Sequence, residues 1–359
     1  MSVQVELFDG GIKEWTRFIK KKQFLPYVSF QHTWEWAESK RADELEIIRL
    51  GFHRDGATIA VGQFIKRPLW FGQHYWIAYR GLCLDYDDEQ DIRECYRAAQ
   101  RYFRRQPKTA FVRFDPDLLR DSAQQQTFRK LGTFSSGGIN NPVNAWCVDL
   151  QDTEEQQFEW MREHGMKKKM PYYYRRAVRD GVKFRKATTP KDINAVLDQL
   201  RTLSERKQFT YTYDTDHIRG QLALMSPPGY EEVFLAEKDG EILASAIVTF
   251  FGREVSYVHG ASTDNHHELC APQFLLIEIM KYAKKHHPDI QRMNFWGIVR
   301  DKYRKLGSKH PGNGYSDFKR SFGGYRVELM MGQNFVYIFP LYLAFYLLEK
   351  YRTKKYRIY

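Results

Sequence analysis

Two stretches of the same design decide the fold, LGFHRDGATIAVGQFI at residues 50–65 and LAEKDGEILASAIVTFF at residues 235–251. In each, an alternating apolar run meets an Asp-Gly pair, and a second alternating run follows. Asp-Gly is strongly favoured in two-residue β-hairpin turns, because both positions of the turn need φ above zero. The sequence therefore predicts two similar hairpins, one in each half of the chain.

The segments after the two hairpins follow one another in the same order. Each half continues with a strand-like segment, a helix-like segment and another strand-like segment. They are YRGLCLD (79–85), ECYRAAQRYFRR (94–105) and AFVRFDP (110–116), then YVHGASTD (257–264), QFLLIEIMKYAKK (273–285) and QRMNFWG (291–297). The repeat predicts an α/β (α+β) protein with two tandem domains, each a mixed, twisted sheet flanked by helices. We place the domains at residues 1–148 and 149–359, and the order suits the N-acetyltransferase (GNAT) fold.

Composition limits the classes of protein that fit. The chain has 359 residues, 43% of them hydrophobic, which suits about two globular domains. Lys and Arg number 56 against 44 Asp and Glu, so the net charge is +12, and such an excess favours polyanionic partners. The four cysteines form no C-x-x-C pair, and the N-terminus has no secretory signal pattern. We therefore expect a cytoplasmic protein with reduced thiols.

The sequence offers no site for a cofactor or a metal. An acetyl-CoA enzyme carries an R/Q-x-x-G-x-G/A loop that holds the pyrophosphate. The nearest attempts, RSFGGY (320–325) and RKLGSK (304–309), lack the last glycine or alanine. His266-His267 with Cys270 does not complete a zinc ligand set, nor does His286-His287. We expect neither a bound cofactor nor a metal.

A basic region, MKKKMPYYYRRAVRDGVKFRK, spans residues 166–186. Taken as a helix, it carries cations on several faces with three tyrosines among them, a pattern that suits a nucleic-acid backbone. A solvated basic helix explains the same pattern, and both interpretations stay open. The candidate nucleic-acid contacts are Lys167, Lys168, Lys169, Arg175 and Arg176.

The C-terminal segment, residues 335–359, joins an apolar run to a basic tail. FVYIFPLYLAFYLL is too short to span a bilayer, and EKYRTKKYRIY follows it directly. The pair is typical of a segment that lies at a membrane interface. A last core strand and helix with a basic tail is the alternative. A helix that leaves an aromatic face uncovered would favour the membrane.

A glycine-rich stretch, HPGNGYSDFKRSFGG at residues 310–324, places Phe318 and Lys319 between a His-Pro-Gly opening and a paired-glycine close. Glycines permit positive φ and close backbone approach. We expect a loop here, in which Lys319 is either a clamp for a phosphate or an oxyanion, or an ordinary surface lysine.

Several of these motifs together resemble one family. AFVRFDPDL (110–118), the basic region, APQFLLIEIMKYAKK (271–285), NFWGI (294–298) and the glycine-rich stretch are similar to the Fem/MurM (FemABX) family of non-ribosomal peptidoglycan aminoacyltransferases. The similarity spans nearly the whole chain, and the last two motifs are the most specific. Some members carry a coiled-coil arm, but no heptad insertion lies between Val182 and Tyr257, so we expect the armless form.

The resemblance implies a reaction and its partners. Two GNAT-like domains would take an amino acid from aminoacyl-tRNA and join it to an amine on the stem peptide of a peptidoglycan precursor, lipid-linked or UDP-linked. The aminoacyl ester is already activated, so no nucleophilic Ser or Cys is required. In the family, a lysine after a phenylalanine matches Lys319 after Phe318, which implies that this pair is catalytic and that Lys319 stabilises the oxyanion and the leaving group.

The same resemblance points to residues for the precursor, in the first domain above all. Family members have a precursor-binding lysine shortly after a Trp-Ala pair, which matches Lys40 after Trp36-Ala37. An arginine and a tyrosine of the family correspond to the stretch from Glu205 that offers Thr212 or Tyr213 and then Asp216 or His217. His259 stands where a tyrosine is usual. The chain departs from the family at these three positions, which puts the identity of the acceptor in doubt.

Two other classes of function stay open. One is a non-catalytic RNA-binding or membrane-binding module built on a degenerate acyltransferase scaffold. The other is an acyltransferase with another donor and another amine acceptor. The amino acid transferred and the number of residues added do not follow from the sequence. If the acceptor is lipid-linked, the protein would act as a peripheral protein at the inner face of the plasma membrane.

Overall fold

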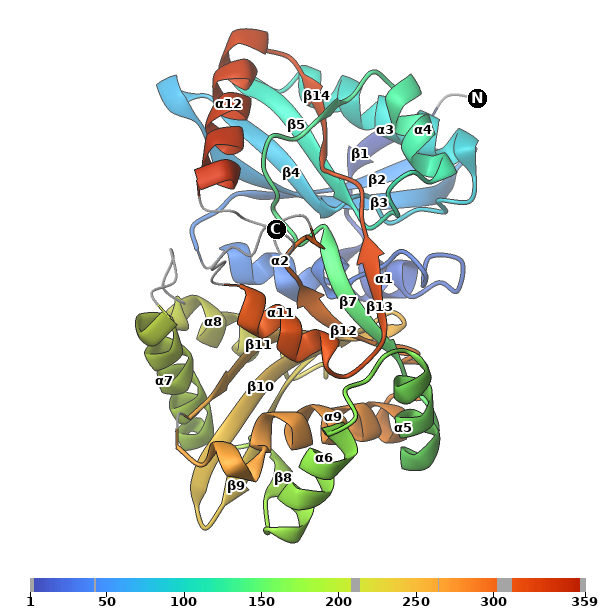
Figure 1. The fold of residues 1–359 in the computed structure, drawn as a ribbon. Coiled ribbons are helices and arrows are strands. Elements are labelled where there is room, and N and C mark those ends of the chain that lie inside the picture. The colour runs from blue at the N-terminus through green and yellow to red at the C-terminus, as the bar shows by residue number, and fades with distance from the viewer. Residues whose placement is uncertain (1–2, 42, 208–213, 264, 302–311, 356–359) are drawn as a thin grey trace. The chain divides into compact units, whose positions relative to one another are not determined.

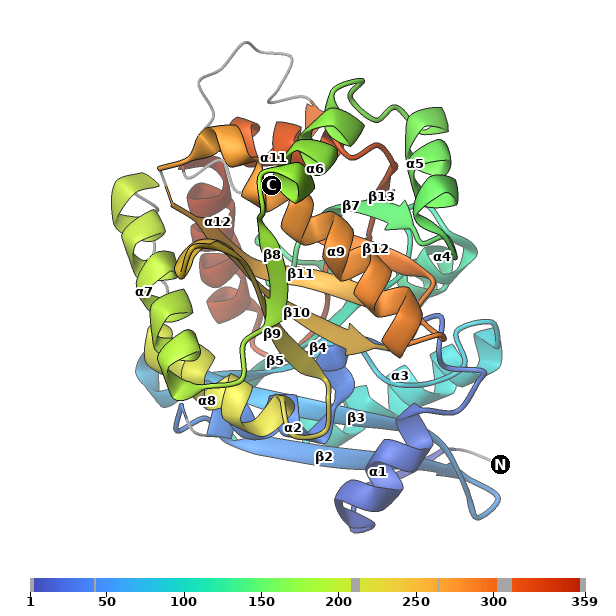
Figure 2. The same ribbon diagram turned by 90° about the horizontal axis from the view of Figure 1, so that it is seen from below.

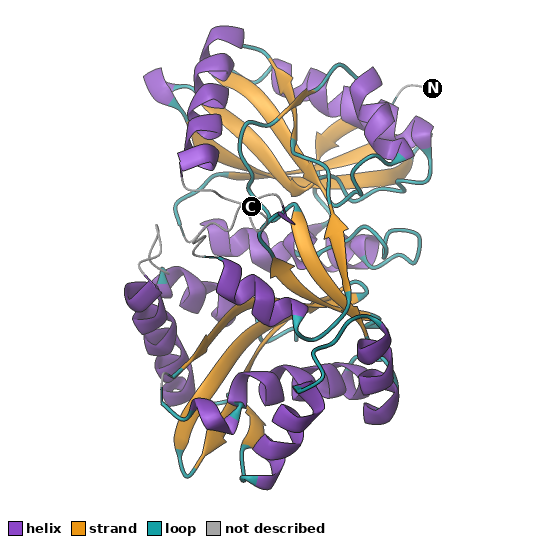
Figure 3. Cartoon of the chain, in the orientation of Figure 1, coloured by secondary structure: helices purple, strands orange, loops and turns teal. Residues whose placement is uncertain are grey.

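The computed structural model describes residues 3–41, 43–207, 214–263, 265–301 and 312–355. The chain folds into two compact units. Unit 1 comprises Met1–Val143 and Glu328–Tyr359, and unit 2 comprises Asn144–Val327. Each unit is a mixed sheet with helices on both faces, as Figures 1 and 3 show.

The sheet of unit 1 has seven strands in the order β1-β2-β3-β4-β5-β14-β6. Their bounds are β1 (Gln4–Leu7), β2 (Ile47–Arg54), β3 (Ala57–Pro68), β4 (His74–Arg80), β5 (Thr109–Pro116), β6 (Phe134–Ser135) and β14 (Gln333–Val336). Only β4 and β5 run parallel, and every other neighbouring pair is antiparallel. A helix joins the parallel pair, as the length of such a crossover requires.

Alternation along β5 assigns the helices of unit 1 to the two faces of the sheet. Phe114 packs against Tyr96 of α3, with ring centroids 4.6 Å apart. Phe111, on the other face, contacts Tyr342 of α12 at 5.3 Å. The helices are α1 (Gly11–Ile19), α2 (Trp34–Arg41), α3 (Glu89–Arg104), α4 (Ala123–Lys130) and α12 (Phe339–Lys355), with short 3-10 turns η1 (Phe30–His32) and η2 (Trp70–Gly72).

Unit 2 repeats this plan with strands in the order β13-β7-β12-β11-β10-β9-β8. The strands are β7 (Asn144–Asp149), β8 (Lys183–Lys186), β9 (Glu231–Lys238), β10 (Glu241–Phe251), β11 (Glu254–Ser262), β12 (Arg292–Gly297) and β13 (Tyr325–Glu328). The helices are α5 (Glu154–Glu163), α6 (Met170–Arg179), α7 (Pro190–Lys207), α8 (Thr215–Met225), α9 (Ala271–His286) and α11 (Asn313–Arg320), with the 3-10 turn η3 (His267–Leu269). Among the described residues of the unit, one apolar cluster includes residues of α6 and α9, and another includes residues of α7 and α8 (Figure 2).

Both predicted hairpins form, and their turns have the expected conformation. Asp55 and Gly56 have φ of 51° and 78°, and Asp239 and Gly240 have φ of 51° and 83°. These left-handed pairs connect β2 to β3 and β9 to β10. The strand, helix and strand after each hairpin are also present, so the prediction of two GNAT-like domains is confirmed. The described residues between Val182 and Tyr257 form no long helical arm.

The C-terminal end of the chain differs from the prediction. The sequence placed residues 335–359 in the second domain, but Glu328–Tyr359 belongs to unit 1. The reason is strand pairing, because Asn334 of β14 lies opposite Arg113 of β5 on one side and Phe134 of β6 on the other. Helix α12 follows and covers β5. In the described part of the chain, no helix combines the length and apolar character needed to cross a bilayer.

Candidate active site

Strands β11 and β12 of unit 2 part after a short stretch of pairing. They run parallel and pair only from Glu254 opposite Arg292 to Ser256 opposite Asn294, although β11 continues to Ser262. In unit 1 the equivalent strands β4 and β5 stay paired from His74 opposite Thr109 to Arg80 opposite Pro116. Parted parallel strands leave main-chain groups at their carboxyl ends, where ligands of open α/β sheets bind. Unit 2 therefore has the opening, and unit 1 does not.

A strained bulge in β12 lies at the place where the strands part. Trp296 has φ of 66°, a left-handed conformation that is a genuine outlier for a bulky residue. Its backbone N–H donates to the Oδ1 of Asn294 at 2.8 Å, and the register with β7 shifts between Asn294 and Gly297. Strain of this kind costs about 1–3 kcal/mol and gathers at functional sites. The NFWGI motif therefore forms a bulge, and the carbonyl oxygen of Gly297 in this bulge points to Lys319.

Glu254 ties the paired ends of β11 and β12 together. It accepts hydrogen bonds from Arg292 Nε at 3.0 Å and from Asn294 Nδ2 at 3.1 Å. Burial by itself would raise the pKa of Glu254, but the charge of Arg292 and the hydrogen bonds from Asn294 and Ser256 lower it. The carboxylate stays ionised and fixes Asn294, which in turn holds Trp296.

Lys319 extends from α11 to the bulge. Its Nζ donates a hydrogen bond to the carbonyl oxygen of Gly297 at 2.7 Å and lies 5.1 Å from the centroid of the Tyr315 ring. Burial removes water from the ammonium group and lowers the pKa of Lys319 to about 7. A lysine of this kind changes charge near neutral pH, and an approaching anion favours its cationic form. The prediction that Lys319 lies in a loop is wrong, because Asn313–Arg320 forms a helix.

Phe318 packs α11 against the core of unit 2. It is half-buried against the larger apolar cluster of unit 2, and its ring lies 5.3 Å from that of Phe322. Phe322 in turn contacts Phe295 of β12 at 5.1 Å. These rings anchor α11 to the strand that carries the bulge. A catalytic role for Phe318 remains a prediction.

The paired glycines fix the end of α11. Gly323 and Gly324 have φ of 77° and 106°. A Cβ atom at Gly323 would collide with the carbonyl oxygen of Met161, and one at Gly324 with that of Cys147. The carbonyl of Gly323 also accepts a hydrogen bond from Trp146 Nε1 at 2.7 Å. Glycine is required at both positions because α5 and β7 approach so closely.

We expect Gly323→Ala to lower the free energy of unfolding of unit 2 by about 2 kcal/mol or more, because it combines a strained φ with a backbone collision. Gly314→Ala is the matched control: it lies in α11, and its Cβ would meet nothing within 4 Å. That change should be neutral or stabilise the helix by up to about 1 kcal/mol. Urea unfolding of both variants makes the comparison, and equal stabilities would contradict this account of the glycines.

The predicted nucleic-acid residues divide into two groups. Lys167, Lys168 and Lys169 are exposed and precede α6, which begins at Met170, so the prediction that they lie within a helix is wrong. The backbone N–H of Lys167 donates to the carbonyl of Ser321 at 3.0 Å, which places the lysines against the end of α11. Arg175 is exposed on α6, and Arg176 forms an ion pair with Asp180 at 3.3 Å.

The predicted precursor residues do not form one cluster. Lys40 and Trp36 lie on α2 in unit 1, where the Lys40 Nζ lies 5.1 Å from the Trp36 ring. His217 lies on α8, and His259 lies on β11 beyond the stretch that pairs with β12. Tyr213 is outside the described residues. Within unit 2, only His259 shares its strand with the opening.

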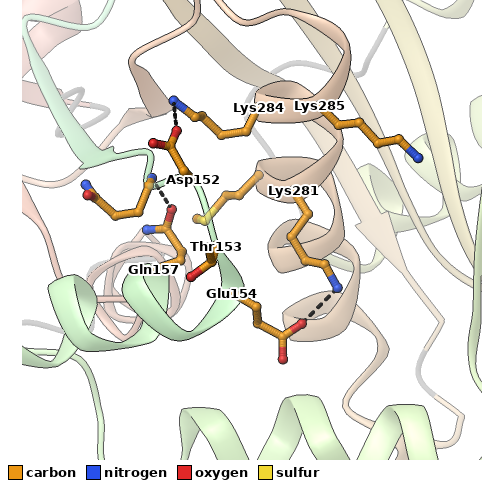
Figure 4. Close-up of a pocket in the computed structure, with 9 residues that line it drawn as sticks. Asp152, Thr153, Glu154, Gln157, Lys281, Lys284 and Lys285 are labelled. Carbon is orange, nitrogen blue, oxygen red and sulfur yellow. Dashed lines mark hydrogen bonds and ion pairs between the residues drawn. The ribbon is translucent and has the colours of Figure 1, made fainter.

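A cavity of about 430 Å³ lies elsewhere on unit 2, between the start of α5 and α9 (Figure 4). Its lining carries five charged side chains, and four of them form two ion pairs. Lys281 contacts Glu154 and Lys284 contacts Asp152, both at 2.8 Å. Because these partners already neutralise one another, the cavity is a weaker site for an ionic substrate than the opening beside Lys319. No group of three or more His, Cys, Asp or Glu side chains in the described ranges could hold a metal.

Some residues of the site carry no sequence signal. Nothing in the sequence marks Trp296 as left-handed, and Tyr315 was not singled out although its ring faces Lys319. Glu254 does have a sequence signal. Glu254 and Ser256 lie two residues apart on one strand, and Arg292 and Asn294 lie two residues apart on the next. Oppositely charged residues on adjacent, otherwise apolar strands suggest a buried ion pair.

Comparison with known proteins identifies the family to which the chain belongs. The family model described as the FemAB family matches residues 12–136 and 230–350. Lipid II:glycine glycyltransferases from two strains of Staphylococcus epidermidis are each 28% identical to the chain over 172 residues. The match covers 46% of this chain and 39% of each relative, so the chain spans about two fifths of the length of these curated relatives.

Three solved structures share the fold. A crystal structure of FemX has a TM-score of 0.82 at 16% identity and covers 95% of this chain and 100% of its own. The C-terminal domain of a putative lysylphosphatidylglycerol synthetase from Agrobacterium fabrum scores 0.53 at 15% identity, covering 95% of both chains. A tandem GNAT protein from the clavulanic acid pathway scores 0.50 at 11% identity, covering 93% of this chain and 98% of its own. Because the family model matches more than half of the sequence, this chain belongs to the FemAB family.

Proposed function

We propose that the protein is an aminoacyltransferase that moves an amino acid from aminoacyl-tRNA to an amine on the stem peptide of a peptidoglycan precursor. The observation that carries the proposal is the position of Lys319, whose Nζ reaches the bulge of β12 where β11 and β12 part. Membership of the FemAB family and the glycyltransferase name of the relatives support the class of reaction.

The reaction needs charge stabilisation more than a nucleophile. The neutral acceptor amine attacks the ester carbonyl of the aminoacyl-tRNA and forms a tetrahedral oxyanion. The new amide bond then remains, the ester C–O bond breaks, and the ribose hydroxyl leaves with a proton that the amine gives up. A preorganised donor aimed at the oxyanion in a dry site lowers the activation free energy by several kcal/mol. Lys319 is the cation placed for this, and its partner Gly297 holds it until substrate arrives.

The lysines at the start of α6 give the tRNA a place to bind. Lys167, Lys168 and Lys169 are exposed in unit 2 beside the end of the helix that carries Lys319. Cations on a short turn contact phosphates without reading the base sequence. Arg175 extends the positive surface along α6. The donor would then enter unit 2 at this turn, with its aminoacyl end toward the parted strands.

We expect replacement of Lys167, Lys168 and Lys169 by glutamine to weaken tRNA binding and to reduce the slope of log affinity against log salt by about 2–3. Titration of fluorescent tRNA at several salt concentrations measures both quantities. The chain offers a matched control in Lys20, Lys21 and Lys22, another exposed three-lysine run. Replacing that run should leave the slope unchanged, and an equal loss in both variants would contradict a tRNA site at α6.

Lys40 and Trp36 are the precursor candidates of unit 1, and the Lys40 ammonium over the Trp36 ring is a suitable contact for a diphosphate or a carboxylate. The other candidates, His259, His217 and Tyr213, belong to unit 2. The UDP-linked and lipid-linked forms share these anionic groups. The lipid-linked form would bring the enzyme from the cytoplasm to the inner face of the plasma membrane.

A transfer assay tests the proposal. Labelled amino acid on total tRNA is incubated with the protein and a UDP-linked pentapeptide precursor, and label in the peptide is counted. We expect transfer that disappears when the tRNA is digested with ribonuclease beforehand or when the precursor amine is acetylated. Transfer that survives ribonuclease, or that occurs only from another acyl donor, would show that the donor is not aminoacyl-tRNA.

A further inference from the structure

The outward side of α12 is an apolar stripe. Phe339, Leu343, Leu347 and Tyr351 follow one another at intervals of four residues and are all exposed, Leu347 by 57%. Residues four apart lie on one face of a helix, so these side chains form one continuous surface. A helix on a water-soluble surface would normally place polar residues there. The stripe is mixed, two aromatic and two leucine side chains, whereas Tyr342 and Phe345 of the same helix pack against β4 and β5.

The inward side of α12 is fixed to the sheet of unit 1. Glu349 forms a bidentate ion pair with the buried Arg113 of β5, at 2.6 and 2.9 Å. Tyr342 is buried and stacks edge-on against Phe111 at 5.3 Å. Because these contacts hold the opposite face, rotation of the helix cannot bury the stripe. Figure 1 shows α12 against β4 and β5.

The connection between β3 and β4 adds a second apolar element beside α12. Trp70 lies 6.3 Å from Phe345 of α12, ring to ring. Phe71, the next residue, is 90% exposed and has φ of 59°. An aromatic side chain this exposed buries little surface against its own protein. Trp and Phe at such a tip are the residues that insert at the boundary between lipid headgroups and acyl chains.

Positive charge continues the stripe at its C-terminal end. Lys350, Arg352, Lys354 and Lys355 are exposed on the last turns of α12, next to Tyr351. Each basic side chain near an anionic leaflet contributes about 1 kcal/mol to membrane association. A second copy of this chain packed with its α12 parallel would bring like charges together instead. Charge complementarity therefore favours an anionic bilayer over such a dimer as the occupant.

We propose that the stripe on α12 (Phe339, Leu343, Leu347, Tyr351), the Trp70–Phe71 tip and the adjoining cations form a docking surface for an anionic lipid bilayer. The helix would lie in the plane of the interface, since its 17 residues do not span a membrane. The inference rests on the proposed function only in giving the surface a purpose, which is to bring the site to a lipid-linked acceptor.

Vesicle flotation with the full chain tests this surface. Vesicles of equal parts phosphatidylcholine and phosphatidylglycerol are compared with vesicles of phosphatidylcholine alone. We expect binding to the anionic vesicles that is roughly tenfold stronger or more. Leu343→Ser with Leu347→Ser should lower it by roughly tenfold or more, as should Phe71→Ser in a smaller measure. Lys350→Glu with Lys354→Glu should remove the preference for anionic lipid.

Leu7→Ser is the matched control, because Leu7 is 60% exposed in β1, at the other edge of the same sheet. It should bind vesicles as the unchanged protein does. No binding of the unchanged protein to anionic vesicles, or equal binding by the stripe variant, would overturn the proposal. So would a dimer in light scattering that Leu347→Ser dissociates, because a second copy would then cover the stripe.

The same preparations are assayed for transfer to the soluble UDP-linked precursor and to the lipid-linked precursor, which separates the two proposals. If transfer occurs and vesicles do not bind, the docking surface is wrong and the proposed function stands. If vesicles bind and no transfer occurs to either form of precursor, the proposed function is wrong and the docking surface stands.

Discussion

Replacing Lys319 by alanine is expected to lower the turnover of aminoacyl transfer by about 10²–10³-fold, the usual cost of removing one donor to a developing oxyanion. The Lys319 ammonium group lies at the β12 bulge. Among the described residues of α11, no other side chain donates a hydrogen bond to Gly297. Binding of tRNA should change little, because Lys167, Lys168 and Lys169 remain. Single-turnover kinetics with charged tRNA measures the loss.

Two further variants make this result specific. Lys191→Ala, at an exposed lysine of α7, should leave turnover unchanged. Lys319→Arg keeps a permanent cation, since a guanidinium does not lose its proton. In the unchanged protein the rate should rise with pH to about 7, the pKa of Lys319, and then level off. Above pH 7 the cationic fraction of Lys319 falls by the same factor as the neutral fraction of the acceptor amine rises. The rate therefore stays constant.

The arginine variant should therefore keep part of its activity, and its rate should go on rising above pH 7. Complete inactivity of Lys319→Arg at every pH would contradict the assignment of a cation and would make Lys319 a proton acceptor instead. Unchanged turnover in Lys319→Ala would remove Lys319 from the mechanism altogether.

Glu349→Ala is expected to destabilise unit 1 by about 3–5 kcal/mol, because it leaves a buried charge without its partner. Arg113 has no exposed surface, and both of its terminal nitrogens donate to Glu349. Its Nε donates to Asn334 of β14 at 2.7 Å, so the same side chain joins β5, β14 and α12. Urea unfolding and hydrogen exchange at β5 and β14 report the loss.

The double change Arg113→Met with Glu349→Leu is the control, because a well-packed apolar pair replaces a buried ion pair at little cost. The lost hydrogen bond to Asn334 adds about 1–3 kcal/mol, so the double change should still cost less than Glu349→Ala. An exposed pair gives the second comparison: Asp121→Asn, opposite Arg129 at 4.0 Å, should shift stability by no more than about 1 kcal/mol. If Glu349→Ala cost no more than Asp121→Asn, the ion pair would not be what holds α12 to the sheet.

The parts of the fold with strong local signals could be predicted from the sequence. Asp55-Gly56 and Asp239-Gly240 force left-handed turns, so both hairpins and their repeat are visible without a structure. Pairing between distant segments could not be predicted in this way. The residues of β14 carry no local mark that selects β5 over a strand of unit 2, and the C-terminal segment was therefore assigned to the wrong unit.

Helix boundaries near the site show the same limit. The glycines around Lys319 favoured a loop, but Ser316 donates its Oγ to the carbonyl of Gly312, and Phe318 and Phe322 bury one face of a helix. Tertiary packing outweighed the low helix propensity of glycine. Pro171, by contrast, was a usable signal, because proline is favoured in the first turn of a helix and marks a start near Met170.

The proposed reaction joins an amino acid from tRNA to a peptidoglycan precursor at Lys319. Mass spectrometry of the UDP-linked and lipid-linked pentapeptide precursors, after incubation with the protein, charged tRNA and mixed amino acids, tests it most directly. We predict a mass increase equal to an aminoacyl residue on at least one precursor, absent without tRNA and formed about 10²–10³-fold more slowly with Lys319→Ala. No increase on either precursor, or an equally fast increase with Lys319→Ala, would contradict the proposed reaction.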